Sequence, residues 1–440
     1  MTGPAQGLFD CPAPRIRAAP ASAPFLDLLA SAMVDALYRA DDPFALSDAL
    51  VLLPNRRATS GLVQAFAKRL GGAALLPSIR PLGDPYADDD PDVWGVEGFD
   101  TSPQIPKMRR RMELAALIRQ RDKAQNGVED PARALALADE LAKLLDSAAT
   151  VERVKWELLP KLVEDIDLAR HWEASARFLD IIATYWPAHL KEAGLSDYAA
   201  YGAELRKALT ARWRANPPAR PIIIAGSTGS IATTRDLMRV VAGLPRGVVI
   251  LPGLAGDIED KSWDLIGDQH PQHALKETLA ALGVDRHAIT PLSEETPSGR
   301  SRRVLMREAL TPAERTADWL QRLSDAGGAA FVKEGAEGLR LLEAATEDEE
   351  ATAIALMLRE VLETPGRTAA LATPDAALAL RVEAKLSRWG IVPSASHGRP
   401  LSETEAGTLI ALLCELARDP GEPVALAALL KHPRVLFSAN

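Results

Sequence analysis

The sequence predicts an α/β protein in which an all-α insertion interrupts a parallel sheet and a second α/β portion follows. Short apolar runs, typical of buried strands, alternate with segments of helical periodicity near both ends of the chain. From Lys107 to about Trp213 the pattern is helical, with no convincing strand. Alternation of strand and helix is the signature of a parallel sheet whose faces are covered by helices.

Composition places the chain among globular proteins. Its 440 residues suit several domains, and 47% hydrophobic with 25% charged residues is an ordinary balance. No apolar run approaches the ~20 residues that span a bilayer, and no secretory signal is visible at the start. We therefore expect a cytoplasmic protein without membrane contact. A net charge of −9 disfavours a surface coated in nucleic acid, but local basic clusters remain compatible with DNA binding.

The first α/β portion is expected to begin with alternating elements. Strands are predicted at 15–20 and 49–54, and helices at 24–38 and 60–70. Residues 83–106, rich in Asp, Gly and Pro, are predicted to form a loop. The expected domain limits are 1–104 for the first part of an α/β domain, 105–218 for the all-α insertion, 219–325 for the return to that domain, and 326–440 for a second, incomplete α/β domain.

After the insertion the strand and helix pattern resumes. Strands are predicted at 222–225 and 247–254, a loop at 285–303 and a helix at 313–323. In the second portion we expect strands at 338–344 and 368–373, and helices at 346–363 and 375–390. Thr346 and Glu349 form a capping box, which explains the acidic run there without a metal.

The stretch "AGSTGS", Ala225 to Ser230, lies between a predicted strand and a predicted helix. A phosphate loop that supports hydrolysis needs G-x-x-x-x-G-K-[ST], and no lysine stands between Ala225 and Thr234. After the first strand, "AAPASAPFLDLL" lacks both the glycines and the lysine, and no predicted strand ends in Asp-Glu. We therefore expect no catalytic residue and no working ATPase.

Two interpretations of this turn remain. Hydroxyl groups of Ser227, Thr228, Ser230 and Thr233, with the helix N-terminus, could hold an anion. Alternatively the turn is structural and Thr233 and Asp236 cap the helix. The structural interpretation is favoured because capping satisfies backbone N–H groups without a ligand.

Other candidate residues predict no metal site. Cys11 and Cys414 are far apart in the sequence, and His270 and His273 favour a surface or capping role. The densest positive stretch, Lys107 to Lys123, predicts either a solvated helix face or a surface that follows phosphates.

Several strings, in order from about Pro14 to the C-terminus, resemble AddB, the subunit of the AddAB helicase–nuclease of double-strand-break repair, in its alphaproteobacterial form. They include "PRIRAAPASAPFLDLLA", "LLPNRRATSGLVQAF", "LLPSIRPLGD", "FLDIIATYWPAHLKEAG", "PIIIAGSTGSIATTRDLMRVVAGLPRGVVILPGL", "HPQHALKETLAALGV", "LMREALTPAERTADW" and "RWGIVPSASHGRPLSETEAGTLIALL". The resemblance implies a superfamily 1 helicase-like (RecA-like) parallel sheet domain with a large all-α, 1B-like insertion. It also implies the start of a second RecA-like, 2A-like domain.

The resemblance also implies site residues. "AAPASAPFL" stands at the Walker A position, and Ala225 and Gly226, followed by Ser227 and Thr228, stand at a degenerate Walker B position. "LPNRRAT" resembles motif Ia, so Asn55, Arg56, Arg57 and Thr59 are expected to contact single-stranded DNA, and Arg80 and Arg381 are further candidates. Ordinary solvation of a helix start is the open alternative for Arg56 and Arg57. Arg381 lies in "ALALRVEAKLSRWGI", which resembles motif IV, and would face a γ-phosphate in an active relative.

The partners that the resemblance implies are AddA, in a heterodimer, and single-stranded or double-stranded DNA ends. In the family, AddA uses ATP for unwinding, and the AddB nuclease domain carries an iron–sulfur cluster and Mg. This chain has neither cluster cysteines nor nuclease residues, so we expect no cofactor in it and no activity from it alone. Two alternatives stay open, a nucleotide-binding P-loop-like enzyme that uses the AGSTGS turn, and a helical scaffold without nucleic acid.

Overall fold

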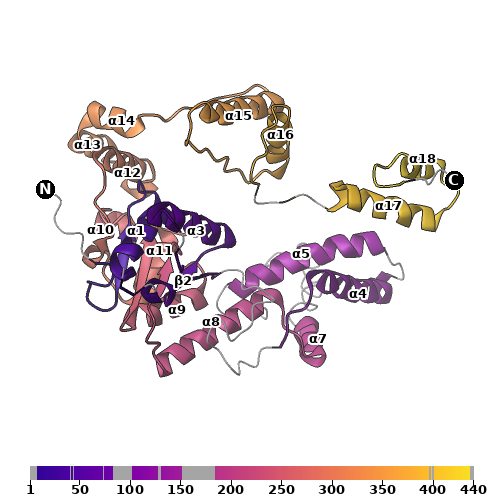
Figure 1. Ribbon diagram of the computed structural model, residues 1–440, viewed down its shortest axis with the longest axis horizontal. Helices are drawn as coiled ribbons and strands as arrows, with labels where there is room; N and C mark the ends of the chain where they lie inside the picture. The colour runs from indigo at the N-terminus through magenta and orange to yellow at the C-terminus, as the bar shows by residue number, and fades with distance from the viewer. Residues whose placement is uncertain are drawn as a thin grey trace, which may run out of the picture. The chain divides into compact units, whose positions relative to one another are not determined.

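The chain folds into two compact units, Met1–Glu337 and Gly338–Asn440. A computed structural model describes residues 7–39, 41–42, 44–72, 74–82, 102–126, 130–150, 184–395, 398 and 401–436 (Figure 1). Most of the loop expected at 83–106 and much of the predicted insertion, 151–183, lie outside these residues.

The first unit is built on a six-stranded sheet in which every pairing is parallel. The strand order is β3-β2-β4-β5-β1-β6. The strands are β1 Ile16–Ala19, β2 Leu50–Leu53, β3 Ser78–Pro81, β4 Ile222–Ala225, β5 Gly247–Pro252 and β6 Thr290–Pro291. This arrangement confirms the predicted α/β class with a parallel sheet.

One face of the sheet packs against helices that come before the insertion. They are α1 Phe25–Leu37, α2 Phe44–Ser47 and α3 Arg56–Leu70. Alternate strand residues such as Ile223 pack in this core with Phe66 of α3. The apolar stripe of each helix faces the sheet, as its periodicity predicts.

The opposite face packs against helices from later in the chain. They are α8 Tyr198–Ala215, α9 Ala232–Gly243, α10 Asp260–Asp264 and α11 His273–Leu282. Ile222 and Ile224 of β4, which alternate along the strand with Ile223, pack against these helices. Because both faces are buried, the central strands are continuously apolar instead of alternating with polar residues.

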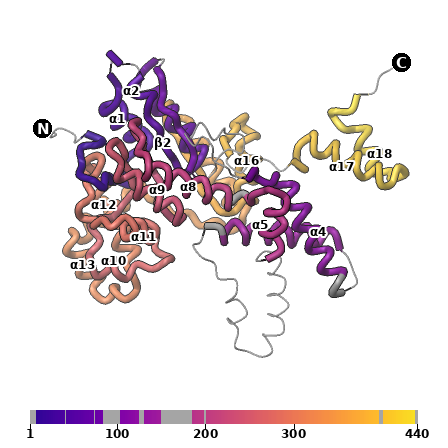
Figure 2. Tube along the Cα trace, turned by 90° about the horizontal axis from the view of Figure 1, so that it is seen from below, coloured from indigo at the N-terminus to yellow at the C-terminus, as the bar shows by residue number. Residues whose placement is uncertain are grey.

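The described part of the insertion is helical, as its pattern predicts. It contains α4 Lys107–Asn126, α5 Pro131–Thr150 and α7 Trp186–Ala193, and it ends with α8. A separate core joins α4, α5 and α7 through residues such as Ile118, Leu141 and Trp186. The helix α8 packs along α9 (Figure 2). Near the end of α8, Trp213 belongs to the core of the sheet.

The segment 285–303, predicted as a loop, is in fact partly regular. It contains the 3₁₀ turn η4 Arg286–Ala288, strand β6 and the start of α12 Pro297–Ala309. A strand of this length gives no periodicity in the sequence, and it forms because β1 offers an edge to pair with. Thr296 caps α12 and Pro297 follows at its first position, a start signal that the sequence does display. The rest of this unit contains η5 Ala313–Arg315, α13 Trp319–Asp325 and α14 Gly328–Ala336.

The second unit contains α15 Glu347–Leu362, α16 Ala376–Ser387, η6 Leu401–Glu403, α17 Glu405–Arg418 and α18 Pro423–Leu430. Thr346 caps α15 as expected, by accepting from the N–H of Glu349 at 3.2 Å. The strands predicted at 338–344 and 368–373 do not form within the described residues. A strand needs a neighbour to satisfy its backbone groups, and these segments have none among the described strands. In the first segment, the side chain of Leu341 is 88% exposed.

A core substitution tests the α3 packing. Phe66→Ala removes a side chain that is 0% exposed, so we expect it to lower the free energy of unfolding by about 3–5 kcal/mol. Urea denaturation followed by circular dichroism measures this change. Val63→Ala on the same helix is the control, because Val63 is 43% exposed. Equal losses for the two variants would contradict the assigned packing.

Candidate functional site

The parallel sheet brings the loops that follow all its strands to one edge, the carboxyl edge. Ligands of open α/β sheets bind in crevices at this edge. The edge divides into two halves, one formed by β3, β2 and β4 and the other by β5, β1 and β6. The first half presents exposed arginines, whereas the second half is lined by arginines and carboxylates in equal number.

In the first half, the head of α3 carries exposed arginines. Asn55 is the N-cap, and its Oδ1 accepts from the N–H of Ala58 at 2.9 Å. The hydroxyl of Thr59 donates to the carbonyl of Arg56 at 2.6 Å. Asn55 and Thr59 therefore stabilise the helix start, whereas Arg56 and Arg57 are exposed in its first turn, where no acidic residue stands.

Arg80 and Arg381, also predicted as DNA contacts, lie in different units. Arg80 is half-buried in β3, opposite Leu52 of β2, near the same edge. Arg381 belongs to α16 of the second unit, where its guanidinium pairs with Glu347 in the first turn of α15. The ion pair with Glu347 therefore gives Arg381 a structural role within the second unit.

The AGSTGS turn is held by its own atoms and by α11. Gly226 and Gly229 have φ values of +76° and +70°, in the left-handed region that favours glycine. Ser227 Oγ accepts from the N–H of Gly229 at 3.2 Å, and the hydroxyl of Thr278 donates to the carbonyl of Thr228 at 2.7 Å. A Cβ on Gly229 would lie 2.2 Å from Thr278 Oγ1. Ala225, the last residue of β4, is fully buried.

The capping role predicted for Thr233 and Asp236 is wrong. Helix α9 begins after Ile231, and no side chain caps it. The hydroxyl of Thr233 instead accepts from Arg206 of α8, and Asp236 pairs with Arg239 one turn later at 3.1 Å. These partners prevail because both residues lie inside the first turns of the helix, past the position from which a side chain can cap it.

Arg206 is a residue that the sequence did not single out. It is 7% exposed, its Nε donates to Thr233 Oγ1 at 2.8 Å, and its Nη1 donates to the carbonyl of Leu82 at 3.0 Å. Burial lowers the pKa of this guanidinium. Among the described residues no carboxylate pairs with it. In the sequence Arg206 looks like any basic residue of an amphipathic helix, so only the fold reveals it.

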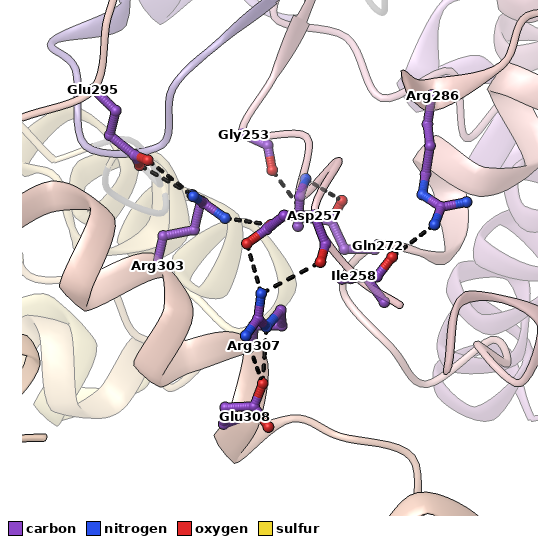
Figure 3. A network of polar contacts seen from close by, with 10 residues as sticks. Gly253, Asp257, Ile258, Gln272, Arg286, Glu295, Arg303, Arg307 and Glu308 are labelled. Atoms are coloured by element: carbon purple, nitrogen blue, oxygen red, sulfur yellow. Dashed lines mark hydrogen bonds and ion pairs between the residues drawn. The ribbon is translucent and has the colours of Figure 1, made fainter. Parts of the chain in front are cut away.

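The second half of the edge contains a cavity of about 610 Å³. Its charged lining residues are Asp257, Arg286, Glu294, Glu295, Arg300 and Arg303. Arg303 lies between Glu295 and Asp257 and pairs with both, and Arg307 reaches Asp257 Oδ2 at 2.6 Å (Figure 3). Arginines and carboxylates lining this cavity are equal in number, so their charges cancel.

The protonation of this network follows from its contacts. Burial raises the pKa of Asp257, but the hydrogen bond from Arg303 and the charges of Arg303 and Arg307 outweigh it, so the pKa lies below its usual value. Burial lowers the pKa of Arg303, and the bonds and charges of Asp257 and Glu295 more than reverse this change. Both groups are therefore charged at neutral pH.

The basic stretch of α4 is largely paired with acids. Arg109 pairs with Glu113 at 2.6 Å, and Arg111 pairs with Asp139 at 2.8 Å. The buried Arg110 pairs with Asp146 and with Asp197, at 2.9 and 3.0 Å. The pair of Arg109 lies within α4, whereas the pairs of Arg110 and Arg111 join α4 to its neighbours, and all of them reduce the positive potential that the sequence suggested.

Neither a metal site nor a membrane span is found in the described parts of the chain. No cluster of His, Cys, Asp and Glu there has the geometry to hold a metal ion. His270 lies just before α11, where its Nδ1 accepts from the N–H of Gln272 at 3.1 Å, but no side chain caps this helix, so the capping role considered for His270 is not found. None of the helices in those parts is long and apolar enough to cross a membrane.

The Asp257 network gives stability a defined pH dependence. Because the pKa of Asp257 is depressed, its contribution is present above about pH 4 and is lost as the pH falls through the folded-state value. We expect Asp257→Asn to lower the free energy of unfolding at pH 7 by about 1 kcal/mol, since the pair is partly exposed. The loss should narrow as the pH falls from 7 to 3, because the unfolded chain then takes up a proton that the ion pairs of Asp257 disfavour in the folded state.

Urea midpoints at both pH values measure the change. Asp268→Asn is the matched control, because Asp268 is an exposed carboxylate of the same unit. A loss for Asp257→Asn that is the same at pH 7 and pH 3 would show that the ion pairs do not stabilise the fold.

Comparison of the chain with models of known protein families finds no match, and comparison with curated proteins finds none either.

Proposed function

We propose that the first unit is a non-hydrolysing, RecA-like helicase domain that binds single-stranded DNA along the β3, β2 and β4 half of its carboxyl edge. The observation that carries the proposal is the contrast between the halves. The first half has exposed arginines at the head of α3 and the buried Arg206 at the head of α9, and neither helix has an acidic residue in its first turn. The second half neutralises its own charges.

Phosphate binding at the first half is supported by electrostatics. The N-terminus of a helix carries the positive end of the helix dipole and unpaired N–H groups, and both attract phosphate. Arg56 and Arg57 add their charges at the head of α3. Contacts of this kind bind the DNA backbone without reading its sequence.

The missing hydrolytic chemistry supports the non-hydrolysing part of the proposal. The loop between β1 and α1, at the Walker A position, contains Pro20 and Pro24, which have no N–H to offer a phosphate. At the Walker B position, Ala225 and Gly226 have no carboxylate for Mg²⁺. The loops after β1 and β4 lie at the same edge of the sheet, with only β5 between the two strands. Walker A and Walker B motifs that bind one nucleotide need such proximity.

The biological setting rests on the resemblance alone. We propose an AddB-type subunit in recombinational repair of DNA double-strand breaks, which works in the cytoplasm with AddA at DNA ends. For the second unit, whose described elements are all helices, the same resemblance implies a part of a second RecA-like domain. No cofactor and no independent enzymatic activity are proposed for this chain.

One observation favours a different function. The 610 Å³ cavity at the ends of β1, β5 and β6 has the size of a small-ligand site. A nucleotide there would make the chain a nucleotide-binding enzyme, with the AGSTGS turn nearby. Cancelled charges in the lining make this the weaker candidate.

Anisotropy of a labelled single-stranded oligonucleotide, measured over a series of salt concentrations, tests the DNA proposal. We expect tight binding at low salt, and a log–log salt slope that falls by about 0.7 for each phosphate that a variant no longer neutralises. Arg56→Ala combined with Arg57→Ala should weaken binding and lower the slope. Arg212→Ala with Arg214→Ala is the matched control, because these exposed arginines lie in the last turn of α8.

Equal effects of the two double variants would reject the placement of DNA on α3. No binding of the wild-type chain at low salt would reject the proposed function. ATP turnover that is lost in Ser227→Ala with Thr228→Ala would favour the nucleotide-binding alternative.

A further inference from the structure

The side chain of Gln272 holds the loop that follows β5. Its Oε1 accepts from the N–H of Ala255 at 3.1 Å, and its Nε2 donates to the carbonyl of Gly253 at 3.0 Å (Figure 3). Ala255 is buried, so its N–H depends on this acceptor. Further along the same loop, Asp257 pairs with Arg303 and Arg307 of α12. The loop is therefore held at two points, and Gln272 is the first of them.

The ring of His270 fixes the position of Gln272. Its Nδ1 accepts from the N–H of Gln272 at 3.1 Å, and the ring also donates a hydrogen bond to the carbonyl of Leu310, at the end of α12. A backbone N–H can only donate and a carbonyl can only accept. The two contacts therefore require a neutral imidazole with its proton on Nε2 and a free lone pair on Nδ1.

Protonation would convert this acceptor into a donor. An imidazolium carries a hydrogen on both ring nitrogens, so the hydrogen on Nδ1 would face the N–H of Gln272. Burial lowers the pKa of His270 and outweighs the carbonyl of Leu310, which raises it. The ring is therefore neutral at pH 7. Its bond to Gln272 is present above the usual histidine value of about 6.5 and is lost as the pH falls through the lower value of the folded state.

The charged groups around His270 are already engaged with one another. Arg307 pairs with Asp257 and Glu308, Arg315 pairs with Glu259 at 2.8 Å, and Asp325 accepts from Gln321 at 2.8 Å. With His270, a cavity of about 330 Å³ is lined by the charged residues Asp257, Glu259, Arg307, Glu308, Arg322 and Asp325. The helices α10 and α11 and the segment between them add Asp260, Lys261, Asp264, Asp268, His273, Lys276 and Glu277.

We infer that His270 is a pH-sensitive switch for the loop after β5. In its neutral form the ring fixes Gln272, and Gln272 holds Gly253 and Ala255. Protonation of Nδ1 breaks the bond to Gln272 and releases this part of the loop. The loop contributes Asp257 to the 330 Å³ cavity, and Leu254, Gly256 and Asp257 to the 610 Å³ cavity, so acid changes the walls of both. The inference goes beyond the proposed function and does not depend on DNA binding.

Hydrogen exchange of the full chain tests the switch. Mass spectrometry of peptides that cover 253–258 gives their protection at about pH 7.5 and about pH 5, on either side of the usual histidine value, with each rate divided by that of the unfolded chain. In the wild type we expect protection of this segment to fall about tenfold at the lower pH, which is the effect of losing one hydrogen bond. Peptides from β4 should keep their protection.

Three variants separate the switch from a general effect of acid. His270→Asn retains an acceptor for the N–H two residues later, as in an Asx turn, and does not titrate, so protection should stay high at both pH values. Gln272→Ala removes the contacts to Gly253 and Ala255, so protection should be low at both. His287→Asn is the matched control, because His287 is an exposed histidine of the same unit, and it should behave as the wild type.

Unchanged protection of the wild-type segment at the lower pH would overturn the switch. So would a loss in His270→Asn equal to that of the wild type, because another group would then be responsible. If His270→Asn does not fold, Gln272→Ala decides the question. A further tenfold loss between the two pH values in Gln272→Ala would show that acid does not act through Gln272, and would overturn the inference.

Discussion

The pairing of β4 with β2 on one side and β5 on the other is the constraint on which the first unit depends. The strand β4 follows the insertion, yet it lies in the middle of the sheet beside a strand that precedes the insertion. Its residues are fully buried on both faces. This pairing brings the AGSTGS turn, the head of α3 and the end of β3 to one edge, and it places α8 where Arg206 can reach that edge.

Charged groups are arranged differently in the two halves of the carboxyl edge. Around the cavity, each cation of the Arg303 and Arg307 network has an acid within reach, so the network is complete in itself. Around Thr233 a buried cation and an uncapped helix start lie together without a described acid. The head of α3 in the same half adds two exposed arginines to the positive end of its helix dipole, and an anion is attracted there.

The sequence predicts features that depend on local interactions. The strand β4 and the cap at Thr346 follow from neighbouring residues, and the structure contains both of them. Features that depend on distant partners could not be predicted. Thr233 was predicted to cap α9, but its hydroxyl accepts a hydrogen bond from Arg206 of α8. Residues 338–344 have the pattern of a strand, but no described strand pairs with them.

The self-neutralised cavity has a consequence for how this protein can change. Conversion into a triphosphate site would need a lysine and N–H groups in the loop that now holds Pro20 and Pro24, together with removal of acids such as Asp257. Removal of Asp257 alone takes one of two acids from both Arg303 and Arg307, which keep Glu295 and Glu308. A triphosphate site would therefore require changes in the loop after β1 and in this network together, because the same carboxylate that repels a phosphate also holds two arginines in place.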